Sequence, residues 1–294
     1  MNSRRRDGVL VTTYDGQGKL IERLYGTMWG RLLLWVLVRP WVSRLGGWLL
    51  ERRISRWLIP GFIRRNRLEL RDYPKREYRS FNDFFTRRIL PERRPVDIEP
   101  EHLIAPCDGK LTVVPIWPGT RFTIKGVSYD MESLLRDETL ARRYRGGLLL
   151  LFRLTVDDYH RYCYASDGIV GTLVRIPGVY HTVNPRAAAA RPIYRENTRE
   201  YGCLETAYFG TMLMMEVGAL LVGRIQNHPV QGFVQRGQEK GLFAFGGSTV
   251  ILVLEKDRVQ MDEDILRNSA AGEETLVRMG EKIGTAQKQG GTLV

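Results

Sequence analysis

FAFGGSTVILVL, residues 243–254, is a strand-like apolar run that two glycines and two hydroxyl residues interrupt in its middle. A purely structural strand would carry bulky side chains at those positions. The run continues as a strand after the interruption, so the Gly-Gly-Ser-Thr step calls for a chemical or structural explanation.

Ser248 within this step admits three interpretations. It could mark a bulge or a tight strand crossing. It could be a hydrolase nucleophile, but that reading fails because Val250–Leu254 continues as strand where a Gly-x-Ser-x-Gly elbow would enter a helix. The third interpretation is that Ser248 attacks its own chain at the unshielded carbonyl of Gly247. The resulting acyl shift gives an ester, and elimination then leaves a pyruvoyl group at the new N-terminus.

The sequence around this run predicts an α+β fold with a mostly β catalytic body of antiparallel sheets. From about Ile104 onward, short apolar runs alternate with glycine-containing turns: KLTVVPIW, RFTIKGVSY, GGLLLLFRLTV, GIVGTLVRIPGVY, GTMLMMEVGALLVGRI and GLFAFGGSTVILVLEKDRV. Helices are expected at Met131–Tyr144 and Asp262–Met279. We expect a helical segment over residues 1–95 and a β-rich catalytic domain over residues 96–294.

Composition excludes several functional classes. With 294 residues and 43% hydrophobic residues, the chain is globular and can bury a substantial core. Its three cysteines, Cys107, Cys163 and Cys203, form no C-x-x-C pair, so reduced thiols are favoured over disulfides. The four histidines show no H-x-x-x-H spacing, so we expect no metal site.

The net charge of +12 lies at one end of the chain. Residues 1–90 hold 20 Lys and Arg against 8 Asp and Glu, whereas the remaining residues hold 25 of each. The same end carries five of the six tryptophans: Trp29, Trp35, Trp41, Trp48 and Trp57. Ile54, Trp57 and Leu58 share one helical face with arginines around them, and Pro60-Gly61 is expected to end that turn.

This basic, tryptophan-rich segment is interpreted as membrane-associating. Its longest uninterrupted apolar run, Leu32–Val38, is bounded by Arg31 and Arg39 and is too short to span a bilayer. The N-terminus does not read as a signal peptide. Tryptophan suits the headgroup layer, and arginines attract anionic lipid. The alternative is a helical pair whose tryptophans pack on the protein's own core. Nucleic-acid binding is not favoured, because no nucleic-acid motif accompanies the charge.

Six motifs in the body resemble, in order, those of the phosphatidylserine decarboxylase family. They are FNDFFTRRI, APCDGKL, DDYHRY, PGVYHTVNP, ENTREY and FGGSTV, which together cover roughly Phe81 to Leu254. The resemblance implies a proenzyme that cleaves itself between Gly247 and Ser248. The products would be a β chain of residues 1–247 and an α chain of residues 248–294 that begins with a pyruvoyl group derived from Ser248.

The resemblance also implies the chemistry of the mature enzyme. The pyruvoyl carbonyl forms a Schiff base with the serine headgroup amine and accepts the electron pair left when CO2 departs, so no external cofactor is needed. The expected partners are phosphatidylserine, an anionic membrane surface and the enzyme's own two chains. The family's β-rich core further suggests a homodimer. The expected location is peripheral, on the cytoplasmic side of the cell membrane.

The candidate catalytic residues are Ser248, Asp108 and His160, which match the family's motifs, and His181, which is a candidate substitute for a missing imidazole. A serine hydroxyl needs a base, and the base needs an orienting carboxylate, which Asp108 matches. His160 is the candidate acid that protonates the carbanion. Many family members have a second histidine at the position of Cys163, and a thiol suits that relay poorly, so either His160 serves both steps or His181 replaces the missing imidazole.

Two alternatives remain open on sequence alone. The enzyme could act on another serine-headgroup lipid, because the headgroup chemistry would be identical. It could also be a non-catalytic, peripheral lipid-binding homologue that keeps the fold without the cleavage.

Overall fold

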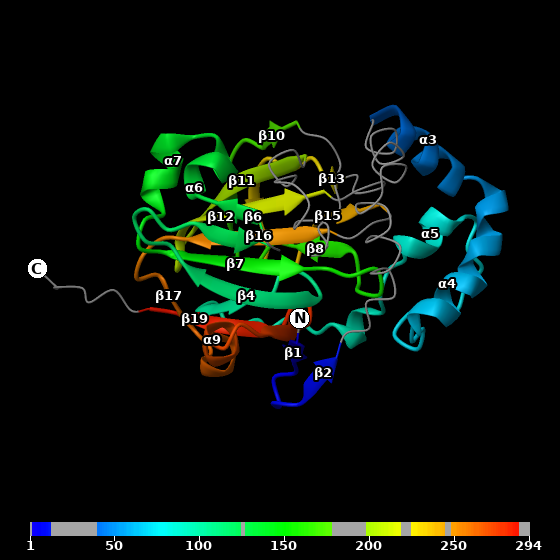
Figure 1. Cartoon of the computed structure of the whole chain (residues 1–294), viewed down its shortest axis with the longest axis horizontal. Helices are drawn as coiled ribbons and strands as arrows, with labels where there is room; N and C mark the ends of the chain where they lie inside the picture. Colours follow the sequence, from blue (N-terminus) through cyan, green and yellow to red (C-terminus); the bar gives the residue numbers. More distant parts are fainter. Residues whose placement is uncertain are drawn as a thin grey trace, which may run out of the picture.

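An eleven-stranded sheet forms the centre of the protein (Figure 1), in the order β14-β9-β11-β12-β16-β7-β4-β18-β1-β2, with β10 paired to β11. Every strand pair in it is antiparallel except β1 with β18. Its strands are β1 (Asn2–Arg4), β2 (Leu10–Thr12), β4 (Gly109–Pro115), β7 (Leu148–Arg153), β9 (Gly168–Val170), β10 (Val174–Ile176), β11 (Arg199–Thr206), β12 (Gly210–Val217), β14 (Gly232–Val234), β16 (Thr249–Leu254) and β18 (Glu274–Val277).

The computed structural model describes residues 2–12, 40–124, 127–177, 198–218, 225–244 and 248–287. His181 and Gly247 lie outside these ranges, as do Trp29 and Trp35.

Strand β16 is buried along its whole length because both faces of the sheet are covered. Successive side chains of a strand point to opposite faces. Val250 and Leu252 therefore join one core cluster, whereas Ile251 and Val253 join the cluster on the other face. This two-sided burial explains why the sequence after Ser248 is continuously apolar rather than alternating.

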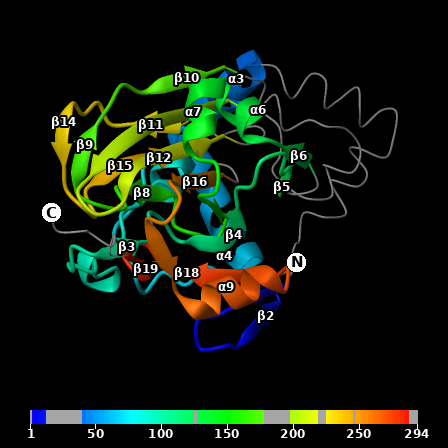
Figure 2. The ribbon, with the colours of Figure 1, turned by 90° about the vertical axis from the view of Figure 1, so that its left-hand side faces the viewer.

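Smaller sheets and short helices cover the two faces (Figure 2). The first core cluster includes residues of the sheets β13-β15-β8 and β17-β19-β3, and the second includes residues of α6 and α7. Helix α9 packs against β4 and β18. The bounds are β3 (His102–Ile104), β5 (Phe122–Ile124), β6 (Val127–Tyr129), α6 (Met131–Leu135), α7 (Glu138–Arg143), β8 (Arg161–Cys163), β13 (Ile225–Asn227), β15 (Glu239–Phe243), β17 (Val259–Met261), α9 (Glu263–Ala270) and β19 (Lys282–Ala286).

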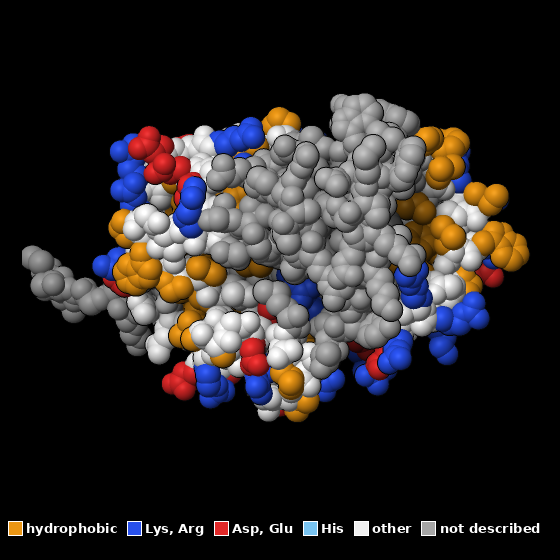
Figure 3. Space-filling view, in the orientation of Figure 1, with side chains coloured by type: hydrophobic (Ala, Val, Ile, Leu, Met, Phe, Trp, Pro, Cys, Tyr) orange, Lys and Arg blue, Asp and Glu red, His pale blue; other side chains and the backbone are white. Residues whose placement is uncertain are grey.

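A group of helices occupies one end of the molecule. They are α3 (Pro40–Leu50), the 3-10 helix η1 (Arg53–Trp57), α4 (Leu58–Asn66) and α5 (Phe81–Phe85), and the 3-10 turn η2 (Pro91–Arg93) follows them. Ile54 is 74% exposed and Trp57 82% exposed. Figure 3 shows hydrophobic side chains gathered at this end, with Lys and Arg side chains beside them. No helix in the described ranges is long and apolar enough to cross a bilayer.

The structure confirms the mostly β body with antiparallel sheets but changes several local expectations. Residues 2–12 form a hairpin on β18, not part of a helical segment, because Ser3 and Arg4 complete the ladder of that strand. Pro60 and Gly61 lie in the first turn of α4, where a proline costs no helical hydrogen bond, so they do not end the turn.

The two helices expected in the body are shorter than predicted. The stretch from Met131 to Tyr144 divides into α6 and α7, because Arg136 adopts a left-handed conformation and Asp137 caps a new helix. The helix expected over Asp262–Met279 ends at Ala270, since Gly272 takes a positive φ of 72° and the chain returns as β18.

Candidate active site

The candidate site lies where three neighbouring strands begin or end. Lys110 of β4 and Thr249 of β16 both pair with Arg153, the last residue of β7. One step beyond this row, the backbone N–H of Leu154 donates to the carbonyl of Ser248 at 2.9 Å. Asp108 immediately precedes β4 at the same end. The topology therefore brings Asp108 and Ser248 to one edge, with β7 between them and about 10 Å of separation.

Ser248 is fully buried at the head of β16. Its carbonyl continues the ladder with β7, so the strand fixes the backbone on its C-terminal side. Gly247 itself lies outside the described residues.

His160 is held beside the chain that leads to Ser248. It immediately precedes β8, which pairs with β15, and its carbonyl accepts a hydrogen bond of 2.9 Å from the backbone N–H of Phe243. Its Nδ1 lies 2.9 Å from the carbonyl of Asp158. A carbonyl only accepts, so Nδ1 carries the proton and Nε2 is left as an acceptor. Nε2 is buried, and no described residue forms a hydrogen bond with it.

Burial sets the protonation state of His160. The ring packs on Phe85 of α5 with 4.3 Å between ring centroids. Desolvation lowers the pKa of His160 from 6.5 to about 4, and the nearby carboxylate of Asp158 opposes this only in part. The imidazole is therefore neutral at pH 7 and presents a lone pair on Nε2, as a general base requires.

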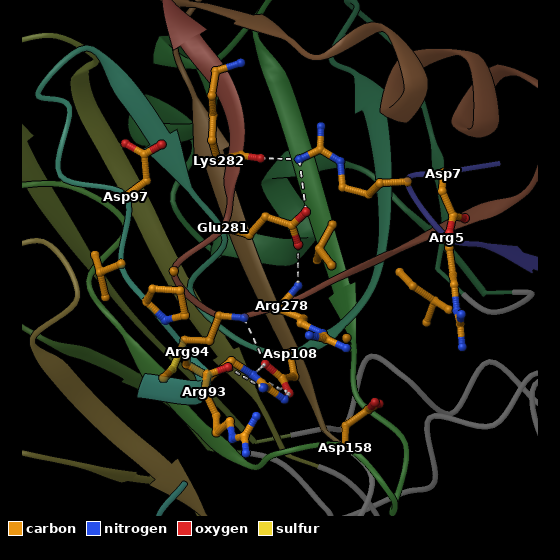
Figure 4. Close-up of a pocket in the computed structure, with 18 of the residues that line it drawn as sticks. Arg5, Asp7, Arg93, Arg94, Asp97, Asp108, Asp158, Arg278, Glu281 and Lys282 are labelled. Carbon is orange, nitrogen blue, oxygen red and sulfur yellow. Dashed lines mark hydrogen bonds and ion pairs between the residues drawn. The ribbon is translucent and has the colours of Figure 1, made fainter. Parts of the chain in front are cut away.

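Asp108 is bound to an arginine and to the backbone (Figure 4). Arg94 donates to its carboxylate from Nε at 2.9 Å and from Nη2 at 2.6 Å, and the N–H of Met279 donates at 2.8 Å. No imidazole within the described ranges is hydrogen-bonded to Asp108. His181, the other candidate partner, lies outside those ranges. The residue after Asp108 is a glycine, Gly109. A Cβ at this position would lie only 3.0 Å from the carbonyl oxygen of Arg153.

Cys163 occupies a dry position behind the site. It is buried, and its backbone N–H donates to the carbonyl of Pro106 at 2.8 Å. Desolvation raises the pKa of its thiol to about 12. A thiol that stays protonated at neutral pH is a poor substitute for an imidazole base.

Sequence reasoning missed an ion pair that joins two of the motifs. Lys110 of the APCDGKL motif donates to Asp158 of the DDYHRY motif at 2.7 Å and to Thr155 Oγ1 at 2.6 Å. Burial alone would raise the pKa of Asp158, but the charge of Lys110 and the hydrogen bonds lower it overall. A lysine at an apolar strand position was the signal that could have revealed this pair.

Sequence reasoning also missed Arg153 and Glu274. Their side chains form a buried ion pair, with Arg153 Nε 2.7 Å from Glu274 Oε1. The pair links β7 to β18, so it joins the expected β chain to the expected α chain next to Thr249. Nothing in the motifs indicated the pairing, because the two residues are 121 positions apart.

A cleft of about 1050 Å³ opens over Asp108 and Asp158 (Figure 4). Its wall is rich in charge of both signs and comes from the N-terminal hairpin, the segment around η2 and the turn before β19. The charged lining residues include Arg5, Arg71, Arg93, Arg94, Asp97, Asp157, Arg278, Glu281 and Lys282. The cleft is polar and accessible, so it suits a charged headgroup better than an acyl chain.

Within the described ranges, no group of three or more His, Cys, Asp or Glu residues is arranged to hold a metal ion. The fold and the site thus define a mostly β protein with a buried serine and a buried, neutral imidazole whose Nε2 has no hydrogen-bond partner among the described residues.

Comparison with known proteins identifies the family. A family model described as "Phosphatidylserine decarboxylase" matches residues 81–285. The chain is 45% identical over 265 residues to "Phosphatidylserine decarboxylase proenzyme 2" of Clostridium acetobutylicum, covering 90% of this chain and 91% of the relative. It is 39% identical over 276 residues to "Phosphatidylserine decarboxylase proenzyme" of Ruminiclostridium cellulolyticum, covering 91% of each. The chain belongs to the phosphatidylserine decarboxylase family.

Proposed function

We propose that this chain is a proenzyme that cleaves itself between Gly247 and Ser248 and then decarboxylates phosphatidylserine to phosphatidylethanolamine. Family membership supplies the reaction and the proenzyme state. The observation that carries the cleavage site is the position of Ser248, buried at the head of β16 directly after a Gly-Gly step.

The proposed cleavage uses His160 as the base. Nε2 takes the proton of the Ser248 hydroxyl, and the oxygen attacks the Gly247 carbonyl. The C–N bond breaks as the ester forms, and the Ser248 nitrogen takes up a proton. Elimination then releases Gly247 as a carboxylate, and water replaces the nitrogen, which leaves as ammonia. The neutral tautomer and the open Nε2 of His160 support this role.

The pyruvoyl group derived from Ser248 supplies the electron sink for loss of CO2. The residues fit such a group, because its precursor is held by the sheet at a water-excluded position. His160 is the candidate to return a proton to the substrate carbon. Its low pKa means that it must first acquire that proton, so the structure supports the base role of His160 more directly than the acid role.

Two further roles in the site are proposed. Asp108 orients the histidine of the relay, and His181 is the alternative base, which would bridge Asp108 and Ser248 in place of His160. The need for a bridge is supported by the strand order, because β7 lies between Asp108 and Ser248.

The helical end is the proposed membrane-binding surface. Its support is the exposure of Trp48, Ile54, Trp57 and Leu58 among arginines, which does not fit tryptophans packed on the protein's own core. Arg52 stacks on Trp48 with 4.1 Å to the ring centroid, a pairing that suits the headgroup layer. The cytoplasmic side of the membrane, the homodimer and the domain division at residue 95 stay predictions.

Intact-mass measurement of the wild type beside Ser248→Ala tests the proposal. The wild type is expected to give chains of 247 and 47 residues, with a blocked N-terminus on the shorter one, whereas Ser248→Ala stays whole. CO2 release from phosphatidylserine vesicles should follow cleavage. His160→Ala and His181→Ala in the same assay identify the base. A wild-type chain that stays uncut with an ordinary serine at 248, yet releases CO2, would disprove the mechanism.

A further inference from the structure

A buried polar cluster lies on the sheet and plays no part in the relay described above. Glu216 of β12 is 0% exposed, and its Oε2 accepts from Lys240 Nζ at 2.7 Å and from Asn227 Nδ2 at 3.0 Å. Asn227 Oδ1 in turn accepts from Lys240 Nζ and from the Tyr162 hydroxyl, each at 3.1 Å. Every polar atom of Asn227 is used, so the amide fixes the geometry of the cluster.

The strand register places Glu216 beside Ser248. Glu216 pairs with Val250, and Val217 pairs with Thr249. Ser248 is two residues before Val250, on the same face of β16, and is therefore the diagonal neighbour of Glu216 at about 7–8 Å between Cα atoms. Met212 and Met214 alternate with Leu213 and Met215 between the two core clusters, which puts Glu216 on this face too.

One carboxylate oxygen of Glu216 has no hydrogen-bond partner in the described part of the chain. Its Oε1 is buried and forms no hydrogen bond with any residue the structure describes. A buried acceptor without a donor is costly unless a ligand supplies one. Burial raises the pKa of Glu216 above its usual range, although the charge of Lys240 opposes the rise.

The other ionisable groups around Glu216 come from four strands. Lys240 of β15 and Tyr162 of β8 approach from the small sheet, and Glu200 of β11 is its direct cross-strand partner. Glu200 shares Asn227 Nδ2 with Glu216, at 3.0 Å, and is also paired with Arg175 of β10 at 3.4 Å. Among the described residues, the cluster balances two carboxylates with two cations and leaves Glu216 Oε1 without a hydrogen bond.

We propose that Glu216 Oε1 receives the headgroup ammonium of the lipid and takes one proton from it. This inference rests on the proposed function. The transfer converts carboxylate and ammonium into carboxylic acid and neutral amine, and only the neutral amine has the lone pair that can attack a carbonyl carbon. An oxygen that only accepts hydrogen bonds selects a cationic donor, so the ammonium fits this position and the substrate's carboxylate and phosphate do not.

The burial of both residues fixes the order of events. Ser248 and Glu216 are each 0% exposed in the uncut chain. A lipid headgroup reaches neither until the bond between residues 247 and 248 is broken. The ammonium position is therefore a property of the cleaved enzyme.

The test compares Glu216→Gln with Glu200→Gln, the same substitution one strand further from Ser248. Because Glu216→Gln leaves Lys240 without its charge partner, the double variant Glu216→Gln/Lys240→Met is made as well. Each protein is mixed with vesicles of phosphatidylserine in phosphatidylcholine and treated with cyanoborohydride. The mass of the 47-residue chain then reports how fast the lipid amine is captured, independently of CO2 release.

All variants are expected to cleave like the wild type. At pH 7, capture should fall at least thirtyfold in both Glu216 variants and less than threefold in Glu200→Gln. The loss of capture in the Glu216 variants should shrink as the pH approaches the pKa of the free headgroup amine, because more of the lipid is then already neutral in solvent. A purely structural defect would not recover in this way.

The outcomes separate this inference from the proposed function. If the wild type is neither cut nor labelled, the proposed function fails. If the wild type is labelled and the Glu216 variants are labelled at the same rate at pH 7, only the ammonium position fails. Equal losses in the Glu200 and Glu216 variants, or a deficit that does not change with pH, would also overturn it.

Discussion

At the scale of single residues, burial sets the protonation states of the side chains in the site. Phe85 and the surrounding core remove water from His160, which keeps the ring neutral, and the carbonyl of Asp158 selects which nitrogen is the acceptor. The same dry environment makes Cys163 inert, since its thiol keeps its proton. Desolvation thus keeps His160 in the neutral form that a base requires and keeps the Cys163 thiol protonated.

The low pKa of His160 predicts a pH dependence of folding stability. The unfolded state binds the proton below pH 6.5, whereas the folded state resists it until about pH 4. Stability should therefore be full above pH 6.5 and fall between pH 6.5 and 4, by on the order of 3 kcal/mol. Denaturant unfolding of the uncut Ser248→Ala protein at several pH values measures this loss.

The matched control is the double variant Ser248→Ala/His160→Gln, which keeps a polar side chain without the titrating ring. Its unfolding free energy should fall less steeply between pH 6.5 and 4. Equal slopes in the two proteins would mean that His160 titrates normally and that the base is not desolvated.

At the scale of elements, the protein contrasts a strand buried on both faces with helices that expose apolar side chains. β16 lies between β12 and β7 at the centre of the sheet. Within the helical end, η1 and α4 are joined to α5 by Ser55, whose hydroxyl accepts from the Phe81 N–H at 2.9 Å, and by Phe62, which packs edge-on against Phe81. The same short helix α5 carries Phe85, so one element connects the exposed surface to His160.

The exposed indole of Trp57 should contribute to membrane binding and not to folding. Trp57→Ala is expected to weaken binding to phosphatidylserine-containing vesicles by roughly tenfold, because an indole buried at the interface is worth a little over 1 kcal/mol. Its unfolding free energy should change by less than about 0.5 kcal/mol. Vesicle sedimentation and denaturant titration measure the two effects.

Trp117 provides the comparison, because it is 61% exposed but belongs to the β body. Trp117→Ala should bind vesicles like the wild type. A loss of binding as large as that of Trp57→Ala would show that the helical end is not the membrane surface.

At the scale of the whole molecule, the proposed cut would divide the chain without dividing the fold. Residues after 247 contribute β16, β17, α9, β18 and β19. β16 and β18 each lie between two strands that precede the cut, and β19 pairs with β3 before the cut and with β17 after it. The N-terminal hairpin adds ion pairs between the residues before and after the cut. Arg6 donates to Asp262 at 2.6 Å and to Asp264 at 3.0 Å, and its third ion pair is with Glu281 at 3.3 Å.

Removing the Arg6 side chain should lower the stability of the folded protein. Arg6→Ala leaves Asp264 without its cation and leaves Asp262 paired with Lys282 alone, and we expect a loss of about 2 kcal/mol and a fall in Tm of about 4–8 °C. Calorimetry of the Ser248→Ala protein measures the effect without interference from cleavage.

Arg5→Ala is the neighbouring control, since Arg5 is exposed and no described carboxylate pairs with it. It should keep the parent Tm. Equal Tm values for both variants would show that the hairpin contacts contribute nothing to stability.

The sequence alone determined the features that depend on local pattern and motif order. The glycine-flanked Ser248, the succession of short apolar runs and the six colinear motifs indicated a mostly β body and the family, which the fold and the comparisons confirm. The clustering of arginine and tryptophan before residue 67 likewise identified a surface with unusual composition. These signals are local, because strand period, turn chemistry and motif spacing are read within a few residues.

Only the tertiary structure decided which distant groups meet. It paired Arg153 with Glu274, Arg6 with Asp262 and Asp264, and Arg94 with Asp108, and it put Glu216 diagonally beside Ser248. It also fixed the tautomer and low pKa of His160. Ion pairing across a sheet and desolvation depend on register and on what covers each face, and neither is encoded in the residues adjacent along the chain.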